Sequence, residues 1–456
     1  MKRIYRPLVA MAVVAAVVVL WILTIGPAER AGGIGRYGAD PLIANVAASY
    51  LALLSCYVVL GRPSWKRRLA NAGINLAAIL VVLLLIETPA MLGFVDYRTV
   101  MTAKEVGASG RHNMRLDREL LHTRPPHDRF VQNARGDIAI GLDYDTGIRY
   151  RFEWRGDRHG FRNSRDLRRA PVVLIGDSFI DGYKVVQEEV CSSRLGEILD
   201  VDVCNLGQCD YGLAQELVVL RRLAVKLRPR VVVWFFCEGN DLQLIEEYRA
   251  AAGDWEAYVK RVDGSWPRSF CRGVRNRVEQ WLEAQYVPDL DEVRRNSAPL
   301  RAEIPGDSVT MYFGAGPRYV SRNYEAALLS ETQDILQEAQ AICDGNDIRF
   351  LVAMVPVRFR VYRDLCEFAE DSHLAECEPN DTPQRLRRRC LDARIKYLDL
   401  TLTLKAAAQA GKLVYLADDD HWSPEGHAVV AKKIAGYIRE RGWLDRGAER
   451  QQATTR

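Results

Sequence analysis

The sequence predicts an α/β protein, in which a three-layer α/β/α domain with a parallel sheet follows three transmembrane helices. Two observations support this. Long uncharged apolar runs occur only in residues 1–95, whereas short apolar runs alternate with amphipathic stretches over most of the remaining chain. The first pattern is typical of membrane spans and the second of buried parallel strands joined by helices.

Composition and charge exclude several classes of protein. The chain has 456 residues, of which 48% are hydrophobic and 27% charged, so it is neither disordered nor collagen-like. Its 63 Lys and Arg barely exceed its 59 Asp and Glu. This balance argues against nucleic acid as a partner, because such proteins usually carry a strong positive excess.

Three apolar runs are long enough to cross a bilayer: residues 8–25, 42–60 and 74–95. Lys and Arg cluster before the first run and between the second and third, which predicts that both segments are cytoplasmic. The remainder of the chain would then be extracytoplasmic, in the periplasm or outside the cell. A cleaved signal peptide is an alternative interpretation of the first run alone. We expect Glu87 to lie at the membrane interface.

The sequence divides into four predicted parts. A membrane anchor spans residues 1–95, a polar connector 96–137, an α/β domain 138–445 and a polar tail 446–456. Within the domain, residues 242–322 form a long insertion rich in aromatic side chains. These aromatics are expected to form the insertion's own core, or alternatively to select a substrate over the active site.

Five short apolar runs in the predicted domain are expected to be strands. They are rich in β-branched or aromatic residues, as strands buried on both faces are, and cover residues 172–175, 201–205, 231–236, 348–355 and 395–398. Amphipathic stretches such as 192–199, 212–227 and 323–343 separate them. Ligands of such sheets bind at the carboxyl ends of the strands, so residues just after each run are candidate site residues.

Residues with the chemistry of nucleophilic acyl transfer occupy these positions. Ser178 follows the first strand, Asn240 the third, and the loop after the last strand contains Asp418, Asp419 and His421. A serine hydroxyl needs an imidazole to accept its proton, the imidazole needs a carboxylate to orient it, and the developing oxyanion needs hydrogen-bond donors. Pro424 after Ser423 predicts a helix over residues 424–441 that supports this loop.

These blocks resemble the SGNH hydrolases, also called the GDSL lipase and esterase family, over residues 149–443. The block Gly176-Asp177-Ser178-Phe179 is similar to the nucleophile motif of the family, and Gly160-Phe161-Arg162-Asn163 to a recurring element of bacterial members. The resemblance implies a flavodoxin-like sheet without metal or organic cofactor. It assigns the nucleophile to Ser178, the base to His421, the orienting acid to Asp418 and an oxyanion donor to Asn240.

The second block departs from the family pattern. By register from Asn205, the position at which the family usually has an oxyanion glycine is Asp210, with Gly207 as an alternative donor. A carboxylate beside a developing oxyanion would repel it unless turned away. The acid also has an alternative, because Asp419 lies two positions before His421, a spacing found in some relatives.

The expected function is a membrane-anchored, extracytoplasmic serine esterase that acts on an ester or acylated glycan or lipid. Two alternatives remain open. One is an O-acetyltransferase for a surface polysaccharide, which would need a membrane-bound acyl-transfer partner, and the other is an inactive glycan-binding member of the fold.

The ten cysteines show no metal-binding spacing, and Cys366 with Cys377 is the one local disulfide predicted. His427 is expected to pack or cap the last helix.

Overall fold

In the computed structural model, the described residues are 2–445 except 24–38, 63, 93, 96, 98–113, 143, 263–268, 284–288, 302–308 and 315–321. The predicted tail 446–456 and residues 96 and 98–113 of the predicted connector therefore lie outside the described residues. The chain forms two compact units. The first comprises residues 1–104 and 260–289, and the second comprises residues 105–259 and 290–456.

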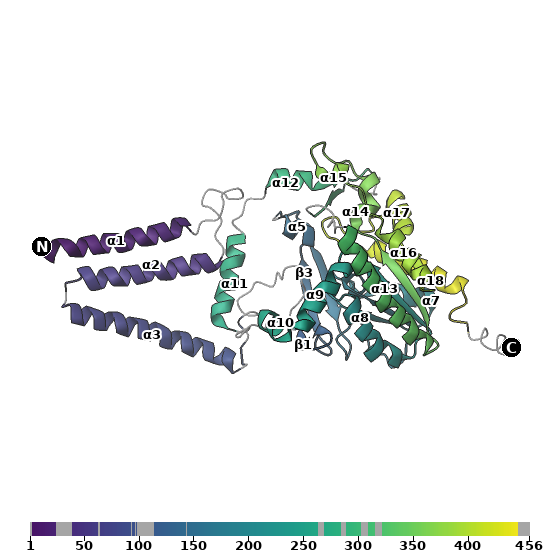
Figure 1. The fold of residues 1–456 in the computed structure, drawn as a ribbon, viewed down its shortest axis with the longest axis horizontal. Helices are drawn as coiled ribbons and strands as arrows, with labels where there is room; N and C mark the ends of the chain where they lie inside the picture. The colour runs from purple at the N-terminus through teal and green to yellow at the C-terminus, as the bar shows by residue number, and fades with distance from the viewer. Residues whose placement is uncertain are drawn as a thin grey trace. The chain divides into compact units, whose positions relative to one another are not determined.

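The first unit contains three helices that are long and apolar enough to cross a membrane, as the sequence predicts. They are α1 (Lys2–Leu23), α2 (Ala39–Leu60) and α3 (Trp65–Met91) (Figure 1). Most of their large apolar side chains are exposed on the protein surface, as expected for helices that face lipid.

A fourth helix of this unit comes from the predicted insertion. Helix α11 (Phe270–Glu283) contacts both α2 and α3. The carboxylate of Glu87 in α3 accepts hydrogen bonds from the backbone N–H groups of Phe270 and Cys271, and Arg275 forms an ion pair with Asp40 of α2. Glu87 thus satisfies backbone donors at the start of α11. We expected residues 242–322 to belong to the α/β domain, whereas this part of them groups with the apolar helices.

The second unit is built on a five-stranded parallel sheet in the order β11-β10-β7-β5-β6. In chain order this is the 2-1-3-4-5 arrangement of flavodoxin-like folds, which confirms the predicted fold class. Each strand agrees with a predicted run to within two residues at either end. The strands are β5 (Val172–Gly176), β6 (Val203–Gly207), β7 (Val231–Cys237), β10 (Arg349–Val355) and β11 (Lys396–Asp399).

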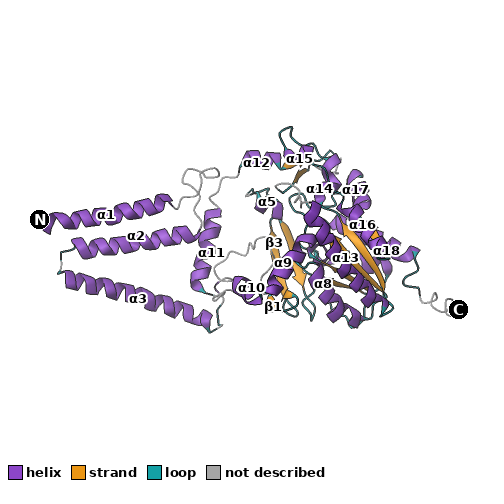
Figure 2. Cartoon of the chain, viewed as in Figure 1, coloured by secondary structure: helices purple, strands orange, loops and turns teal. Residues whose placement is uncertain are grey.

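Helices cover both faces of the sheet, as Figure 2 shows. Alternate side chains of each strand enter two separate hydrophobic cores, because successive residues of a strand point to opposite faces. One core includes α7 (Cys191–Leu199), α17 (Thr401–Gln409) and α18 (Pro424–Glu440). The other includes α8 (Leu213–Val219), α13 (Arg322–Asp344) and α16 (Thr382–Asp392).

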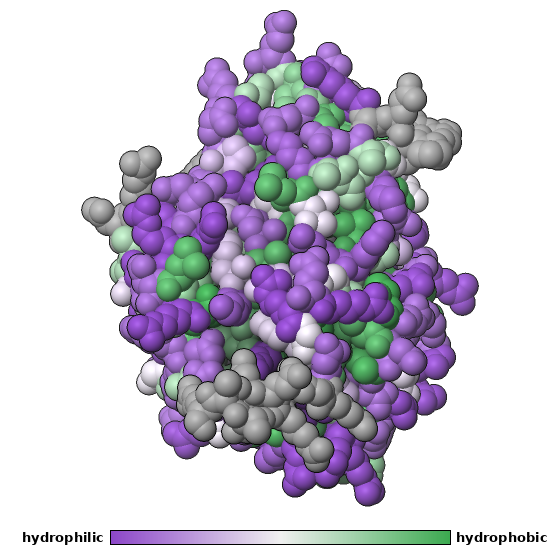
Figure 3. Space-filling model, turned by 90° about the vertical axis from the view of Figure 1, so that its right-hand side faces the viewer, coloured by the Kyte–Doolittle hydropathy of each residue, from purple (hydrophilic) through white to green (hydrophobic). Residues whose placement is uncertain are grey.

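Smaller elements complete this unit. They include the antiparallel pairs β1 (Arg115–Asp117) with β2 (Leu121–Thr123), β3 (Arg129–Ala134) with β4 (Tyr150–Arg155), and β8 (Ser297–Pro299) with β9 (Thr310–Tyr312). The remaining helices are α5 (Asp137–Gly141), α6 (Ser178–Asp181), α9 (Asp241–Gly253), α12 (Leu290–Arg295), α14 (Arg358–Tyr362) and α15 (His373–Glu376). Helix α10 (Trp255–Val262) belongs to this unit up to Val259. Strands β1 to β3 therefore occupy residues that we expected to form a connector. The face seen in Figure 3 is mostly hydrophilic, with apolar side chains in small separate patches.

Candidate active site

The sheet order brings the ends of β5 and β7 next to each other, at the point where the strand order reverses. Ser178 begins α6 directly after β5, and Asn240 precedes α9 just after β7. Between β5 and Ser178, the buried carboxylate of Asp177 accepts hydrogen bonds from the Phe179 N–H at 3.0 Å and from Nδ2 of Asn240 at 2.9 Å. Asp177 thus ties the two strand ends together.

The structure brings Ser178 and His421 together although 243 residues separate them. Oγ of Ser178 and Nε2 of His421 are 2.7 Å apart, and Nδ1 of His421 lies 2.6 Å from Oδ1 of Asp419. This is the hydroxyl, imidazole and carboxylate chain that activates a serine nucleophile. The structure thus brings Ser178 and His421, two of the three expected residues, into the expected contact.

The expectation that Asp418 contacts His421 is wrong in this structure. The Asp418 carboxylate instead accepts hydrogen bonds from the hydroxyl groups of Tyr150 and Thr146, and its carbonyl accepts from the N–H groups of Ile138 and Ala139. Asp419 reaches His421 through a tight turn, in which its Oδ1 also accepts the backbone N–H of His421 at 3.0 Å.

Electrostatics within this chain favour an ion pair between Asp419 and His421. Burial alone would raise the pKa of Asp419, but the charges of Lys184 and His421 outweigh it and hold this pKa well below its ordinary value. Burial would likewise lower the pKa of His421, yet the adjacent Asp419 carboxylate outweighs it and raises that pKa to about 9. A raised pKa favours the protonated imidazole, so the neutral form that can accept the Ser178 proton becomes more populated as the pH rises.

The two predicted backbone oxyanion donors differ in their geometry. The Gly207 N–H lies within β6 and donates to Oδ1 of Asn205 at 2.8 Å, which argues against the alternative prediction that it serves as an oxyanion donor. Asp210 has φ 63°, the left-handed conformation that favours glycine. Asp is among the residues that tolerate this conformation, so it can replace glycine there without changing the backbone path.

Residues 160–163, which resemble a recurring element of bacterial SGNH hydrolases, hold the loop that follows Ser178 through Arg162. The guanidinium of Arg162 is buried and donates to the carbonyl oxygens of Asp181, Gly182, Val185 and Glu153, and to Oε1 of Gln187. By donating to five acceptors, the rigid, planar guanidinium links the end of α6 and the segment after it to Glu153. Arg162 therefore positions Ser178 indirectly.

Sequence reasoning missed three charged groups around the acid loop, of which Arg358 and Lys184 are buried and Asp137 is partly exposed. Arg358 donates to the carbonyl oxygens of Leu416, Ala417 and Asp419. Lys184 forms ion pairs with both Asp419 and Asp137, and Oδ2 of Asp419 also accepts the Asp137 N–H at 2.7 Å. These residues carry no motif, and only the folded chain brings them to the loop.

His427 is buried at the start of α18, and its Nδ1 accepts the Cys191 N–H at 3.2 Å. Burial lowers its pKa to about 3, so it stays neutral. This contact matches the packing role expected for it.

The donor atoms of Asp137, Asp419 and His421 lie within 4.8 Å of one another, close enough to hold a metal ion. However, the ammonium group of Lys184 bonds both carboxylates, and both ring nitrogens of His421 are hydrogen-bonded. The positive charge that these donors need is thus supplied by the protein, and the donor set does not suit a metal.

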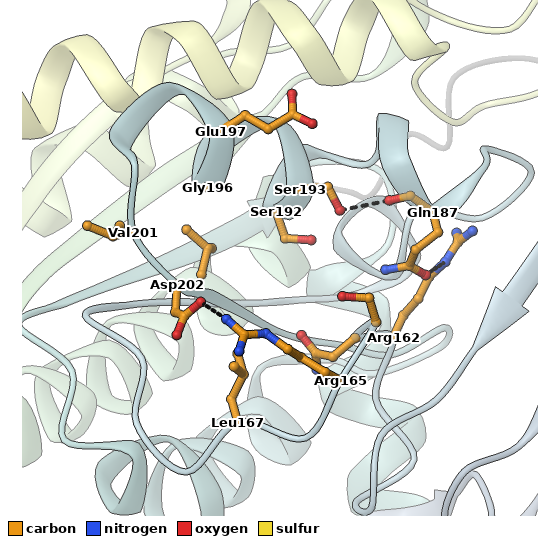
Figure 4. A pocket seen from close by; sticks show the side chains of 13 residues that line it. Arg162, Arg165, Leu167, Gln187, Ser192, Ser193, Gly196, Glu197, Val201 and Asp202 are labelled. Carbon is orange, nitrogen blue, oxygen red and sulfur yellow. Dashed lines mark hydrogen bonds and ion pairs between the residues drawn. The ribbon is translucent and has the colours of Figure 1, made fainter.

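A shallow hollow of about 130 Å³ lies elsewhere on this unit, beside α7 and the start of β6 (Figure 4). Ser178 and His421 are not among its lining residues. Its polar groups bond one another, as Arg165 does with Asp202 and Ser193 with the Gln187 carbonyl. It is therefore a separate surface feature.

All ten cysteines belong to the described residues, and all are free thiols in the structure. The predicted disulfide between Cys366 and Cys377 is therefore not formed. Cys366 is buried whereas Cys377 is partly exposed.

Comparison with known proteins supports this architecture. Residues 313–456 match the family model described as "SGNH hydrolase-like domain, acetyltransferase AlgX". Over these residues the chain is similar to an SGNH hydrolase-like domain, in agreement with the resemblance drawn from the sequence blocks.

Among curated proteins, the chain is 31% identical over 116 residues to a "Probable alginate O-acetylase AlgJ" of Azotobacter vinelandii. It is 30% identical over 101 residues to the protein of the same description in Pseudomonas fluorescens. The aligned stretches cover 25% and 21% of this chain, and 29% and 24% of those relatives.

Solved structures similar to the chain include a lipase/acylhydrolase from Enterococcus faecalis, with 14% identity and a TM-score of 0.31, covering 59% of this chain and 95% of the other. An acetyl xylan esterase shows 11% identity and a TM-score of 0.32, covering 59% and 98%.

Proposed function

We propose that this protein is a membrane-anchored, extracytoplasmic acyltransferase that moves an acetyl group to a polysaccharide hydroxyl through a covalent Ser178 intermediate. The observation that carries the acyl-transfer chemistry is the hydrogen-bonded chain from Ser178 through His421 to Asp419. The acceptor rests on the AlgX family description and on the O-acetylase relatives. The sequence alone favoured an esterase, in which water is the acyl acceptor, whereas we now favour a polysaccharide hydroxyl as the acceptor.

In the first half-reaction, Oγ of Ser178 attacks the carbonyl carbon of the donor ester while Nε2 of His421 accepts the hydroxyl proton. Asp419 stabilises the imidazolium through Nδ1. The tetrahedral intermediate then collapses, the bond to the leaving group breaks, and His421 gives the proton to that group. Ser178 remains acetylated.

In the second half-reaction, the acceptor hydroxyl gives its proton to His421 and attacks the acetyl carbonyl, which releases Ser178 with its proton restored. Asn240, whose amide has a second N–H besides the one bonded to Asp177, and the N–H groups of Ser178 and Asp210 would stabilise each oxyanion. Each such donor is typically worth about 2.7 to 4 kcal/mol.

The membrane part of the proposal follows from charge and hydropathy. The basic residues at the start of α1 and in residues 62–68, ahead of the apolar part of α3, favour a cytoplasmic position for both segments. Three crossings would then export the domain. Its donor would then be supplied across the membrane, which calls for a membrane-bound partner that delivers acetyl groups.

The full chain in detergent, supplied with p-nitrophenyl acetate and alginate oligosaccharides, tests this function. We expect acetylated oligosaccharide and a Ser178 peptide heavier by one acetyl group in mass spectrometry. Ser178→Ala should abolish both, whereas Ser164→Ala, which changes an exposed serine, should retain both.

A second candidate is an esterase, since the same triad can use water as acceptor. Acetate released at an equal rate with and without oligosaccharide, with no acetylated sugar formed, would support the esterase. Absence of any Ser178 acetylation would contradict both functions.

A further inference from the structure

Lys184 and Asp137 lie directly behind the acid of the triad. The Lys184 side chain is fully buried and its ammonium bonds one carboxylate oxygen of Asp137 and Oδ2 of Asp419. Asp419 is also fully buried, and its other oxygen, Oδ1, faces His421. The two oxygens of one carboxylate thus connect a lysine on one side with the imidazole on the other.

This arrangement differs from what the proposed mechanism requires. A serine triad needs an acid to orient its histidine, but not a buried cation on that acid. Moving an ammonium group out of water is costly unless partners satisfy it, and here two carboxylates do so. Because Lys184 is buried next to the reacting residues despite this desolvation cost, it is a candidate for adjusting their pKa values.

We propose that Lys184, which is buried, and Asp137, which is partly exposed, form a charge pair that positions Asp419 and sets the pH range in which His421 acts as a base. This inference rests on the proposed acyl-transfer function. Lys184 and Asp137 are positioning residues: both bond Asp419, and their charges also act on the imidazole through space. Among the residues that the structure describes, neither forms a hydrogen bond with Ser178 or His421.

The two charges have opposite effects on the imidazole. Lys184 stabilises the Asp419 carboxylate and repels an imidazolium, whereas Asp137 attracts the imidazolium. Burial and the neighbouring Asp419 carboxylate raise the pKa of Asp137 to about 6, so Asp137 is largely charged at neutral pH. Other charged or titratable groups around Asp419 and His421 are Asp177, Tyr183, Asp418, Tyr150, Arg358 and His427.

The sign of the pH effect follows directly. Only neutral His421 can accept the Ser178 proton, so kcat/KM should rise with pH through the pKa of His421 in the free enzyme. Asp137→Asn removes a negative charge and should move this limb about one unit lower. Lys184→Met removes a positive charge and should move it about one unit higher.

The experiment measures kcat/KM for p-nitrophenyl acetate against pH for the full chain and four variants. The double variant Asp137→Asn with Lys184→Met removes both charges and should return the limb to within about half a unit of wild type. Tyr150→Phe is the control, because it removes a hydrogen bond from the same loop without changing a charge, and it should leave the limb in place.

Single variants that shift the limb in the same direction, or leave it unmoved, would overturn the inference, since a merely structural role predicts no opposite signs. If Lys184→Met does not fold, Asp137→Asn alone still tests it by the predicted downward shift. Histidine NMR titration of His421, assigned with His421→Gln, gives the same shifts without catalysis. An inactive wild type with the expected NMR shifts would thus contradict the proposed function but support the charge pair.

Discussion

The two units of the molecule use the same apolar residue types in opposite ways. Leu85 of α3 is 68% exposed, whereas Leu351 of β10 is fully buried. In the second unit, strand side chains alternate between two cores under helices. In the first, apolar side chains cover helices on most sides, as expected for surfaces that lipid covers. A leucine in the second unit therefore stabilises the fold by packing against other side chains, whereas a leucine in the first unit is suited to contact with lipid.

The largest effect should distinguish chemistry from anchoring. Ser178→Ala should reduce turnover by a factor on the order of 10⁴ to 10⁶, because the nucleophile itself is lost. Leu85→Ala in α3 should leave turnover per purified molecule within about twofold. Rates with p-nitrophenyl acetate measure both. A large loss in the α3 variant would show that the site depends on the apolar helices.

The next largest effect separates the two adjacent acids. Asp419→Asn should reduce kcat by about 10⁴, because the amide cannot stabilise the imidazolium or hold its tautomer. Asp418→Asn should cost less than about tenfold, since its partners are the hydroxyl groups of Tyr150 and Thr146. Equal losses in both variants would contradict the geometry of the acid loop.

A stability test addresses the two uses of leucine. Leu351→Ala in the sheet should lower the free energy of unfolding by about 2 to 5 kcal/mol, through lost burial and a cavity. Leu85→Ala should cost well under half as much in a lipid-like solvent, because detergent or lipid fills the space. Urea unfolding of the detergent-solubilised chain, followed by tryptophan fluorescence, compares the two. A larger cost for Leu85 would indicate that α3 is packed against protein.

The smallest effect concerns the helix that the first unit gains from the insertion. Glu87→Ala removes the acceptor for the Phe270 and Cys271 N–H groups and should cost about 0.5 to 2 kcal/mol of local stability at the start of α11. Faster hydrogen exchange in residues 270–275 measures this loss. Glu87→Gln keeps one oxygen acceptor and should have a smaller effect. Unchanged hydrogen exchange in both variants would contradict the hydrogen bonds between Glu87 of α3 and the start of α11.

Much of the fold could be predicted because it depends on local patterns. Each strand of the sheet is a short apolar run with turn-forming residues after it, so the runs indicated the strands closely. The contributions of α5 and of the segment near Thr146 and Tyr150 could not be predicted. They reach the acid loop from some 270 residues away, and no local pattern encodes such a contact.

The sequence by itself determined the three apolar helices, the parallel sheet and the positions of Ser178, Asn240 and His421 after strands or in the late loop, because hydropathy period and turn chemistry are local properties. Tertiary structure alone decided which of two adjacent aspartates faces His421. It also decided that Lys184 and Asp137 lie behind that aspartate and that Gly207 is engaged within β6. Those choices depend on the direction of side chains across a packed interior, where burial makes each charge and hydrogen bond depend on residues distant in the chain.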